Sequence, residues 1–194
     1  MAINLQKGQK VDLTKGNAGL KTLMVGLGWD EAVKKKGFFG KKEDIDCDAS
    51  AILLMNGKFL GKDDLVYFGN LKHRSGSVVH QGDNLTGAGE GDDEQIKIWL
   101  DKVPPNCDKI VIVVNIYQAV QRRQHFGMIK NAFIRIVNDQ TGEELLKYNL
   151  SENYEGMTAM IFGEVYRYGG EWKFSAIGQA TSDPGLTELV RRYI

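Results

Sequence analysis

Apolar and polar residues alternate along the first third of the chain. A period of two residues is that of a β-strand with one face packed against a core. Turn signals such as Asn56-Gly57 separate these stretches. Strands are therefore predicted at residues 11–13, 20–27, 45–51 continuing to 55, 65–68 and 77–80.

The remainder of the chain repeats this pattern and adds little helix. Residues 109–117 are almost entirely β-branched, which is typical of a central strand. Further strands are predicted at 95–100, 132–137, 144–150, 158–166 and 172–178, the last four as two hairpins. A turn or two of helix is predicted at 118–125. A last short helix is expected to have Asp183 as its N-cap, Pro184 at its first position and Leu186, Leu189 and Val190 as its apolar stripe.

These elements predict an all-β fold, an antiparallel β-sandwich of two sheets with a few short helices including one at the C-terminus. The sequence has no βαβ rhythm, internal repeat or linker. Residues 1–194 are therefore expected to form one domain, since a chain of this length can bury its own core.

Composition narrows the function classes. Lys plus Arg and Asp plus Glu both number 25, so no overall charge attracts nucleic acid or an anionic membrane. No apolar stretch approaches the roughly 20 residues of a membrane-spanning helix, and the N-terminus does not resemble a signal peptide. The chain is expected to be soluble and unexported, with no nucleic-acid partner and no transmembrane segment of its own.

Candidate nucleophiles and bases are few. Cys47 and Cys107 lie far apart without a CxxC motif, so we expect two small core residues rather than a disulfide or a zinc site. His73, His80 and His125 are scattered, with no partner residue that would make any of them a catalyst, and we expect them to be surface or half-buried. The sequence therefore does not predict an enzyme.

The stretch from Gly82 to Glu94 holds a concentration of acidic residues. It has four glycines, no Lys or Arg, and the neutral oxygen donors Asn84 and Thr86. Its five carboxylates are those of Asp83, Glu90, Asp92, Asp93 and Glu94. Such a loop repels itself unless a cation binds, and Ca²⁺ accepts about 6–8 oxygen ligands in loose geometry. The leading interpretation is a calcium site.

Three carboxylates outside this loop are further candidates. Asp46 and Asp48 stand on one face of a predicted strand, where they either share a cation or protect a solvent-facing strand edge, and the pattern alone leaves both open. Asp30 follows the strand at 20–27 and gives a weaker signal. Together with the loop they make eight carboxylates, more than one Ca²⁺ neutralises, so two ions are predicted.

Other interpretations of the acidic loop are weaker. An EF-hand would need ligands where Leu85 and Gly87 stand and a helix where Ile96 and Ile98 alternate. A phosphate-binding glycine loop would not carry five carboxylates. A purely structural acidic turn stays open, because charge runs are usually solvated. The basic segment at 34–42 is expected to be a solvated loop rather than an anion or membrane site.

Taken together, several motifs resemble those of the TerD family of tellurite-resistance and stress-response proteins. They are residues 26–30, 46–50, 82–94, 159–167 and 170–174, and the resemblance covers essentially the whole chain. It implies a calcium-binding β-sandwich in the bacterial cytoplasm, with partners among other Ter-type resistance proteins, including a membrane-embedded TerC-like protein at the inner face of the membrane. Its metal ligands would lie at 83–94, with Asp30, Asp46 and Asp48 contributing from neighbouring strands.

The resulting hypothesis is a calcium-dependent sensor or scaffold. Bound ions would neutralise the loop and fix a surface that a partner recognises. The alternative is a metal-dependent enzyme acting on a tellurium, thiol or phosphate compound.

Overall fold

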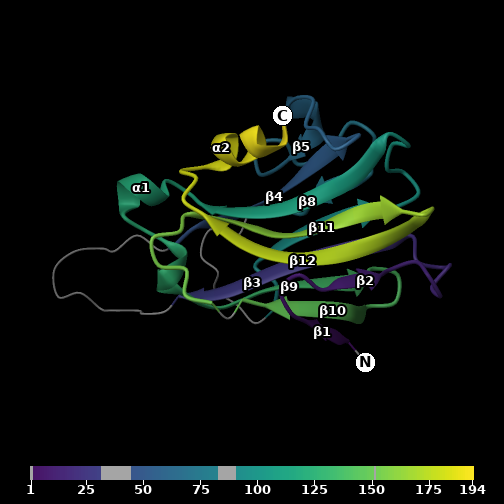
Figure 1. The fold of residues 1–194 in the computed structure, drawn as a ribbon, viewed down its shortest axis with the longest axis horizontal. Coiled ribbons are helices and arrows are strands. Elements are labelled where there is room, and N and C mark those ends of the chain that lie inside the picture. Colours follow the sequence, from purple (N-terminus) through teal and green to yellow (C-terminus); the bar gives the residue numbers. More distant parts are fainter. Residues whose placement is uncertain (1, 32–44, 83–90, 151) are drawn as a thin grey trace.

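The computed structural model of the protein describes residues 2–31, 45–82, 91–150 and 152–194. In these ranges the chain forms two six-stranded sheets that pack face to face (Figure 1). The first sheet has the order β1-β10-β9-β3-β7-β6 and the second the order β2-β12-β11-β8-β4-β5. The predicted β-sandwich of two sheets is confirmed.

The strands of the first sheet are β1 (Ile3–Leu5), β3 (Thr22–Glu31), β6 (Val78–His80), β7 (Glu94–Trp99), β9 (Ile129–Asn138) and β10 (Glu143–Asn149). Those of the second sheet are β2 (Lys10–Asp12), β4 (Cys47–Met55), β5 (Leu65–Val66), β8 (Cys107–Ile116), β11 (Ala159–Tyr168) and β12 (Glu171–Thr181). All pairings are antiparallel except that of β1 with β10, which is parallel.

Helical segments are short. They are the α-helices α1 (Ala119–Arg122) and α2 (Leu186–Val190) and the 3₁₀ turns η1 (Lys62–Asp64), η2 (Phe126–Met128) and η3 (Arg191–Tyr193). The two predicted hairpins are confirmed as β9–β10 and β11–β12. The predicted central strand is β8, which pairs with β11 on one side and β4 on the other.

The start of the terminal helix differs from the prediction. Gly185 is the N-cap residue and no side chain caps the helix. Asp183 instead accepts a hydrogen bond of 2.7 Å from Nε of Arg192. Its carboxylate therefore pairs with a guanidinium group and does not cap the helix. The apolar stripe is present, with Leu189 and Val190 buried and Leu186 packed beside them.

Two hydrophobic clusters explain why the sheets are so deeply buried. The larger cluster fills the space between the sheets, where β3, β7 and β9 face β4, β8 and β11. The smaller cluster lies on the outer face of the second sheet, where Ile52, Val111 and Ile161 pack under Leu189 and Val190 of α2. Figure 1 shows α2 lying over this sheet. Strands β4 and β8 are therefore covered on both faces.

This cover overturns one interpretation of the aspartates at 46 and 48. All nine residues of β4 are buried, and Asp48 is only 5% exposed. The strand lies between β8 and β5 rather than at an edge of the sheet. The alternation of the sequence suggested one wet face, but α2 and η1 lie over that side. The interpretation of Asp48 as a solvent-facing edge residue is wrong.

Candidate metal centre

Six of the ten predicted metal ligands fall within the described residues. Asp83, Asn84, Thr86 and Glu90 lie outside them, so their assignment stays a prediction. The other six come from three places in the fold. Asp30 belongs to β3, Asp48 to the start of β4 with Asp46 just before that strand, and Glu94 to the start of β7 with Asp92 and Asp93 just before it.

The starts of β4 and β7 meet around the buried thiol of Cys47. Burial raises the pKa of this thiol well above its usual range, and the negative charges of four carboxylates raise it further. In decreasing order of effect they are Asp48, Asp46, Asp93 and Glu94. The sandwich thus brings together acidic residues that the sequence places on two distant segments, and the composite site that these residues are expected to form stays a prediction.

Asp46 and Asp48 are held by the neighbouring strand β8 and the residue after it. Asn115 Nδ2 of β8 lies 3.4 Å from Oδ2 of Asp48, directly across the strand pair. The backbone oxygen of Asp46 accepts a hydrogen bond of 2.8 Å from the backbone N–H of Tyr117. These contacts fix the backbone that presents the two carboxylates.

Asp93 and Asp30 form the second acidic group. Oδ2 of Asp93 accepts a hydrogen bond of 2.8 Å from the backbone N–H of Trp29. Burial raises the pKa of the Asp93 carboxyl; the Trp29 N–H opposes this rise, and the charges of Asp30 and Asp92 add to it. A carboxylate whose pKa is raised by burial and, to a smaller extent, by like charges is one that a cation would stabilise.

A bulge in β9 places the residue that holds Asp30. Gly28 pairs with Phe133 and Asp30 with Lys130, so Asn131 and Ala132 together oppose Trp29 alone. Asn131 has a φ of 54°, in the left-handed region that asparagine tolerates better than most residues. Its Nδ2 donates a hydrogen bond of 2.8 Å to Oδ2 of Asp30.

Asp92 has a different partner. Its side chain is fully buried, and Arg135 of β9 binds both its oxygens, Nε to Oδ1 at 2.7 Å and Nη2 to Oδ2 at 3.0 Å. Gln95 Nε2 adds a contact of 3.2 Å to Oδ2. This bidentate geometry is a strong form of carboxylate pairing. The predicted ligand role of Asp92 remains a prediction, but the described contacts make it an anchor between β7 and β9.

Glu94 contacts His80. The same imidazole also contacts Gly82, so it links the first and last residues of the acidic segment 82–94. Nε2 of His80 is 2.8 Å from Oε2 of Glu94 and 3.2 Å from the backbone oxygen of Ala49. Nδ1 of His80 accepts a hydrogen bond of 3.1 Å from Gly82 N–H, which leaves the proton of a neutral imidazole on Nε2. The expectation of surface or half-buried histidines is wrong for His80 and His73, which are 3% and 1% exposed.

The described candidate ligands are of the chemical type that binds a hard cation. All six described candidates are carboxylates, which suit Ca²⁺ and not zinc. Within the described ranges, no three His, Cys, Asp or Glu side chains form a group that could hold a metal ion. Because Arg135 already neutralises Asp92, the described carboxylates left to contribute to an ion site are Asp30, Asp46, Asp48 and Asp93, and they would need further ligands from outside the described ranges.

Several residues of this region carried no signal in the sequence. His80, Asn131 and Arg135 become neighbours of the carboxylates only through strand pairing. The one available hint was the Gly26-Leu27-Gly28 spacing in β3. A Cβ at Gly26 would overlap the carboxylate of Asp92, and one at Gly28 would overlap the ring of Phe133.

Comparison with known proteins now adds to the geometry. The family model of the TerD domain matches residues 1–193. The chain belongs to the TerD family. Stress response protein SCP2 of Bacillus subtilis (strain 168) is 59% identical over 199 residues, covering 100% of both chains. Tellurium resistance protein TerD of Serratia marcescens is 48% identical, covering 100% of this chain and 97% of that protein.

Other relatives of this TerD-family chain support the same family and fold. General stress protein 16U of Bacillus subtilis (strain 168) is 50% identical over 194 residues, covering 100% of this chain and 97% of its own. The crystal structure of a TerD homologue from Streptomyces coelicolor A3(2) has a TM-score of 0.63 at 22% identity. It covers 85% of this chain and 92% of that one, and it shows the fold alone. The protein is thus a TerD-family relative of stress-response and tellurium-resistance proteins.

One further finding concerns membranes. No helix among the described residues is long and apolar enough to cross a bilayer.

Proposed function

We propose that this TerD-family protein is a calcium-dependent scaffold in the response to stress and tellurium compounds. The observation that supports it most is the contact between the starts of β4 and β7, where Nε2 of His80 lies 2.8 Å from Oε2 of Glu94 and 3.2 Å from the backbone oxygen of Ala49, the residue after Asp48. A family match over residues 1–193 and relatives named for stress response and tellurium resistance give the biological setting.

The burial of several neighbouring carboxylates is the reason that a cation would stabilise this region. Asp48 and Glu94 are nearly inaccessible to water, so their charges are poorly screened from Asp46 and Asp93. Bound Ca²⁺ would supply positive charge and accept oxygen ligands in flexible geometry. Asp46, Asp48 and Asp93 would contribute ligands at the junction of β4 and β7, together with Asp83, Asn84, Thr86 and Glu90 of the acidic loop. Two ions would be shared among these residues, the number that the count of carboxylates in the sequence predicts.

Bound calcium is proposed to order the segments that meet at this end of the sandwich. Binding to the folded state alone stabilises that state, and the segments joined at this junction become less free to separate. A fixed surface at this end of the sandwich would then be recognised by other Ter-type resistance proteins, including a TerC-like membrane protein. The chain would act in the cytoplasm, at the inner face of the membrane when bound to that partner.

Calcium titration of the purified protein tests this proposal. Calorimetry is expected to show saturable binding, and calcium at about 100 times Kd should raise the Tm by roughly 5–10 °C. Asp48→Asn combined with Asp93→Asn should remove most of this rise. Asp101→Asn, an exposed aspartate in the turn after β7, is the matched control and should leave it unchanged.

Two results would contradict the proposal. One is the absence of any binding heat at millimolar calcium. The other is turnover of a tellurium, thiol or phosphate compound by the metal-loaded protein that disappears with the same carboxylates, since it would make the protein an enzyme.

A further inference from the structure

A two-residue turn follows the end of β4 and leads toward η1. Met55 and Lys58 close it with two backbone hydrogen bonds, of 2.8 and 3.2 Å, and its loop residues are Asn56 and Gly57. Both loop residues have positive φ, 52° and 80°, as a type I′ hairpin turn requires. The sequence contains no other Asn-Gly pair. This turn is therefore the one place in the chain where an asparagine precedes a residue without a side chain.

An Asn-Gly pair can react with itself. The backbone nitrogen of the residue after an asparagine attacks the side-chain amide carbon and closes a five-membered imide. The reaction is least hindered when that residue is glycine, because no Cβ obstructs the approach. Asn56 and Gly57 are both exposed, and a Cβ at Gly57 would meet no atom within 4 Å. Water can therefore enter this turn, and ammonia can leave it.

The two reacting groups are held differently. Within the described ranges the side-chain amide of Asn56 makes no hydrogen bond, while its backbone N–H is bound to the backbone oxygen of Asn106 at 3.1 Å. The N–H of Gly57 donates a hydrogen bond of 2.8 Å to Oδ1 of Asp108, at the start of β8. The amide carbon that is attacked is thus free to rotate, and the nitrogen that attacks is held by a carboxylate.

This hydrogen bond opposes ring closure. The N–H that Asp108 binds lies in the peptide plane, whereas the nitrogen attacks through the face of that plane. The peptide between Asn56 and Gly57 must therefore rotate away from Asp108 before the ring closes. The nitrogen must also lose its proton, and a proton shared with an acceptor is harder to remove. Breaking the contact with Asp108 is thus a step on the way to the imide.

We propose that Asn56 is a deamidation site and that the hydrogen bond from Gly57 to Asp108 sets its rate. The Gly57 nitrogen loses its proton to hydroxide and forms a bond to Cγ of Asn56 as the Cγ–Nδ2 bond breaks. The departing nitrogen takes a proton from water and leaves as ammonia. Water then opens the imide at either carbonyl and gives aspartate or isoaspartate, with no oxidation or reduction. The reaction needs neither calcium nor a partner protein.

The product changes a turn that contacts the C-terminal segment. The N–H of Phe59 donates a hydrogen bond of 2.7 Å to the backbone oxygen of Tyr193, and both side chains pack against the α2 cluster. Isoaspartate adds a methylene group to the backbone, which the paired ends Met55 and Lys58 accept only by shifting. Either product also places a new negative charge close to Asp108. Deamidation is therefore expected to loosen the packing of the C-terminal helix.

Peptide mass spectrometry of aged protein tests the proposal. The parent protein and Asp108→Ala are incubated at pH 8, and the peptide that contains Asn56 is followed for the mass gain of an amide that becomes an acid. Asp108→Ala is expected to react about fivefold faster or more, the factor that corresponds to one ordinary net hydrogen bond. Equal rates in the two proteins, or no mass gain in either, would overturn the proposal.

Matched variants isolate the hydrogen bond. Asp108→Asn keeps an oxygen acceptor and should react more slowly than Asp108→Ala; equal rates would contradict a role of the hydrogen bond. Asp108→Val, a strand-forming residue without an acceptor, takes the place of Asp108→Ala if that variant does not fold. Asp12→Ala removes an exposed carboxylate from β2, at the opposite edge of the second sheet, and should leave the rate unchanged. In guanidinium chloride, all these proteins should react at one rate.

Hydrogen exchange measures the effect on the fold. The deamidated protein carries one more negative charge, so anion exchange separates it from the parent. Residues 186–193 should exchange faster in the deamidated form. Asn56→Gln would have to close a six-membered ring and should therefore show no change with age. Equal exchange in the deamidated and parent forms would contradict the predicted effect on the C-terminal helix.

Discussion

At the scale of single residues, the pairing of Asp92 with Arg135 has the strongest geometry near the candidate centre. Arg135 reaches Glu144 as well, with Nη1 3.1 Å from Oε2, so one guanidinium links β7, β9 and β10. The hydrogen bond that Arg135 donates to Asp92 is the largest cause of the raised pKa of Arg135. A side chain bound in this way holds the start of β7 in place. Contact with an ion would then be made by the neighbouring carboxylates.

Gly26→Ala tests this anchor without touching a charged group. The new Cβ would overlap the Asp92 carboxylate and force it away from Arg135, so we expect a loss of about 1–3 kcal/mol in the free energy of unfolding. Urea denaturation measures it. Gly19→Ala is the control, since a Cβ there meets no atom within 4 Å and should cost little. An equal loss in both variants would show that the effect is general to alanine.

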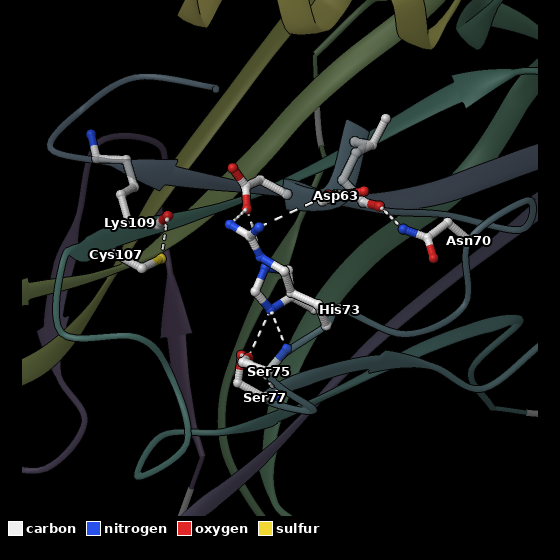
Figure 2. Close-up of polar contacts among 10 residues, drawn as sticks. Asp63, Asn70, His73, Ser75, Ser77, Cys107 and Lys109 are labelled. Carbon is white, nitrogen blue, oxygen red and sulfur yellow. Dashed lines mark hydrogen bonds and ion pairs between the residues drawn. The ribbon is translucent and has the colours of Figure 1, made fainter. Parts of the chain in front are cut away.

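At the scale of elements, the segment between η1 and β6 is held by its own buried network. Nε2 of His73 lies 3.3 Å from Oδ1 of Asp64. Nδ1 of His73 is 2.7 Å from Oγ of Ser75, and Figure 2 shows His73 pointing toward Ser75 and Ser77. Ser75 Oγ also accepts a hydrogen bond of 3.1 Å from the N–H of Ser77 and contacts its hydroxyl at 2.7 Å.

This Asp–His–Ser order is that of a catalytic triad, but its contacts are those of a turn. The Ser75 hydroxyl bonds to groups within two residues of it, and its oxygen is already engaged by Ser77. Neither of the two described pockets is lined by Asp64, His73 or Ser75. We interpret the network as structural, since a buried imidazole and carboxylate satisfy each other there.

His73→Ala should therefore destabilise the fold. It leaves Asp64 buried with fewer partners, and the expected cost is about 1–3 kcal/mol in the free energy of unfolding. Faster hydrogen exchange at residues 64–78 should accompany it. Lys72→Ala, a change at the exposed neighbour, is expected to be nearly neutral. Unchanged exchange in His73→Ala would contradict a structural role.

At the scale of the whole molecule, a tyrosine is buried in or beside each of the two hydrophobic clusters. The stability of the protein at alkaline pH therefore reports on the packing of both clusters. Burial raises the pKa of Tyr154, in the cluster between the sheets, to about 12, and that of Tyr193, beside the α2 cluster, to about 12. An unfolded tyrosine titrates near 10. Between these values the unfolded chain loses the protons that the folded chain keeps, so stability falls as pH rises from about 10 to 12.

Tyr154→Phe combined with Tyr193→Phe should flatten this alkaline decline. At pH 7 the Tyr154 change is expected to cost little, because phenylalanine keeps the ring in the cluster and gives up only the contact of the hydroxyl with the Glu152 backbone. Thermal unfolding from pH 8 to 11.5 measures the slope. Tyr168→Phe, at an exposed tyrosine, is the control and should keep the slope of the parent protein. An unchanged slope in the double variant would contradict the burial argument.

The sequence by itself determined the strands and the family. Period-two alternation, the β-branched run of β8 and the turn signals of the two hairpins are local properties, and they survive in the fold because a sandwich buries one face of each strand. The acidic motifs, too, are local, and they identify the TerD family that the comparisons confirm. Four of the predicted ligands, Asp83, Asn84, Thr86 and Glu90, lie outside the described residues.

Only the tertiary structure decided which of these residues meet. Packing of the second sheet buries Asp48 beside Asn115 of β8, pairing of β3 with β9 creates the Asn131 bulge, and Arg135 binds Asp92 from another strand. Asp183 pairs with Arg192 instead of capping a helix. Each of these results depends on strand register or on contacts between distant segments. Alternation along a strand indicates which face a side chain takes, but the elements packed on that face decide what it contacts.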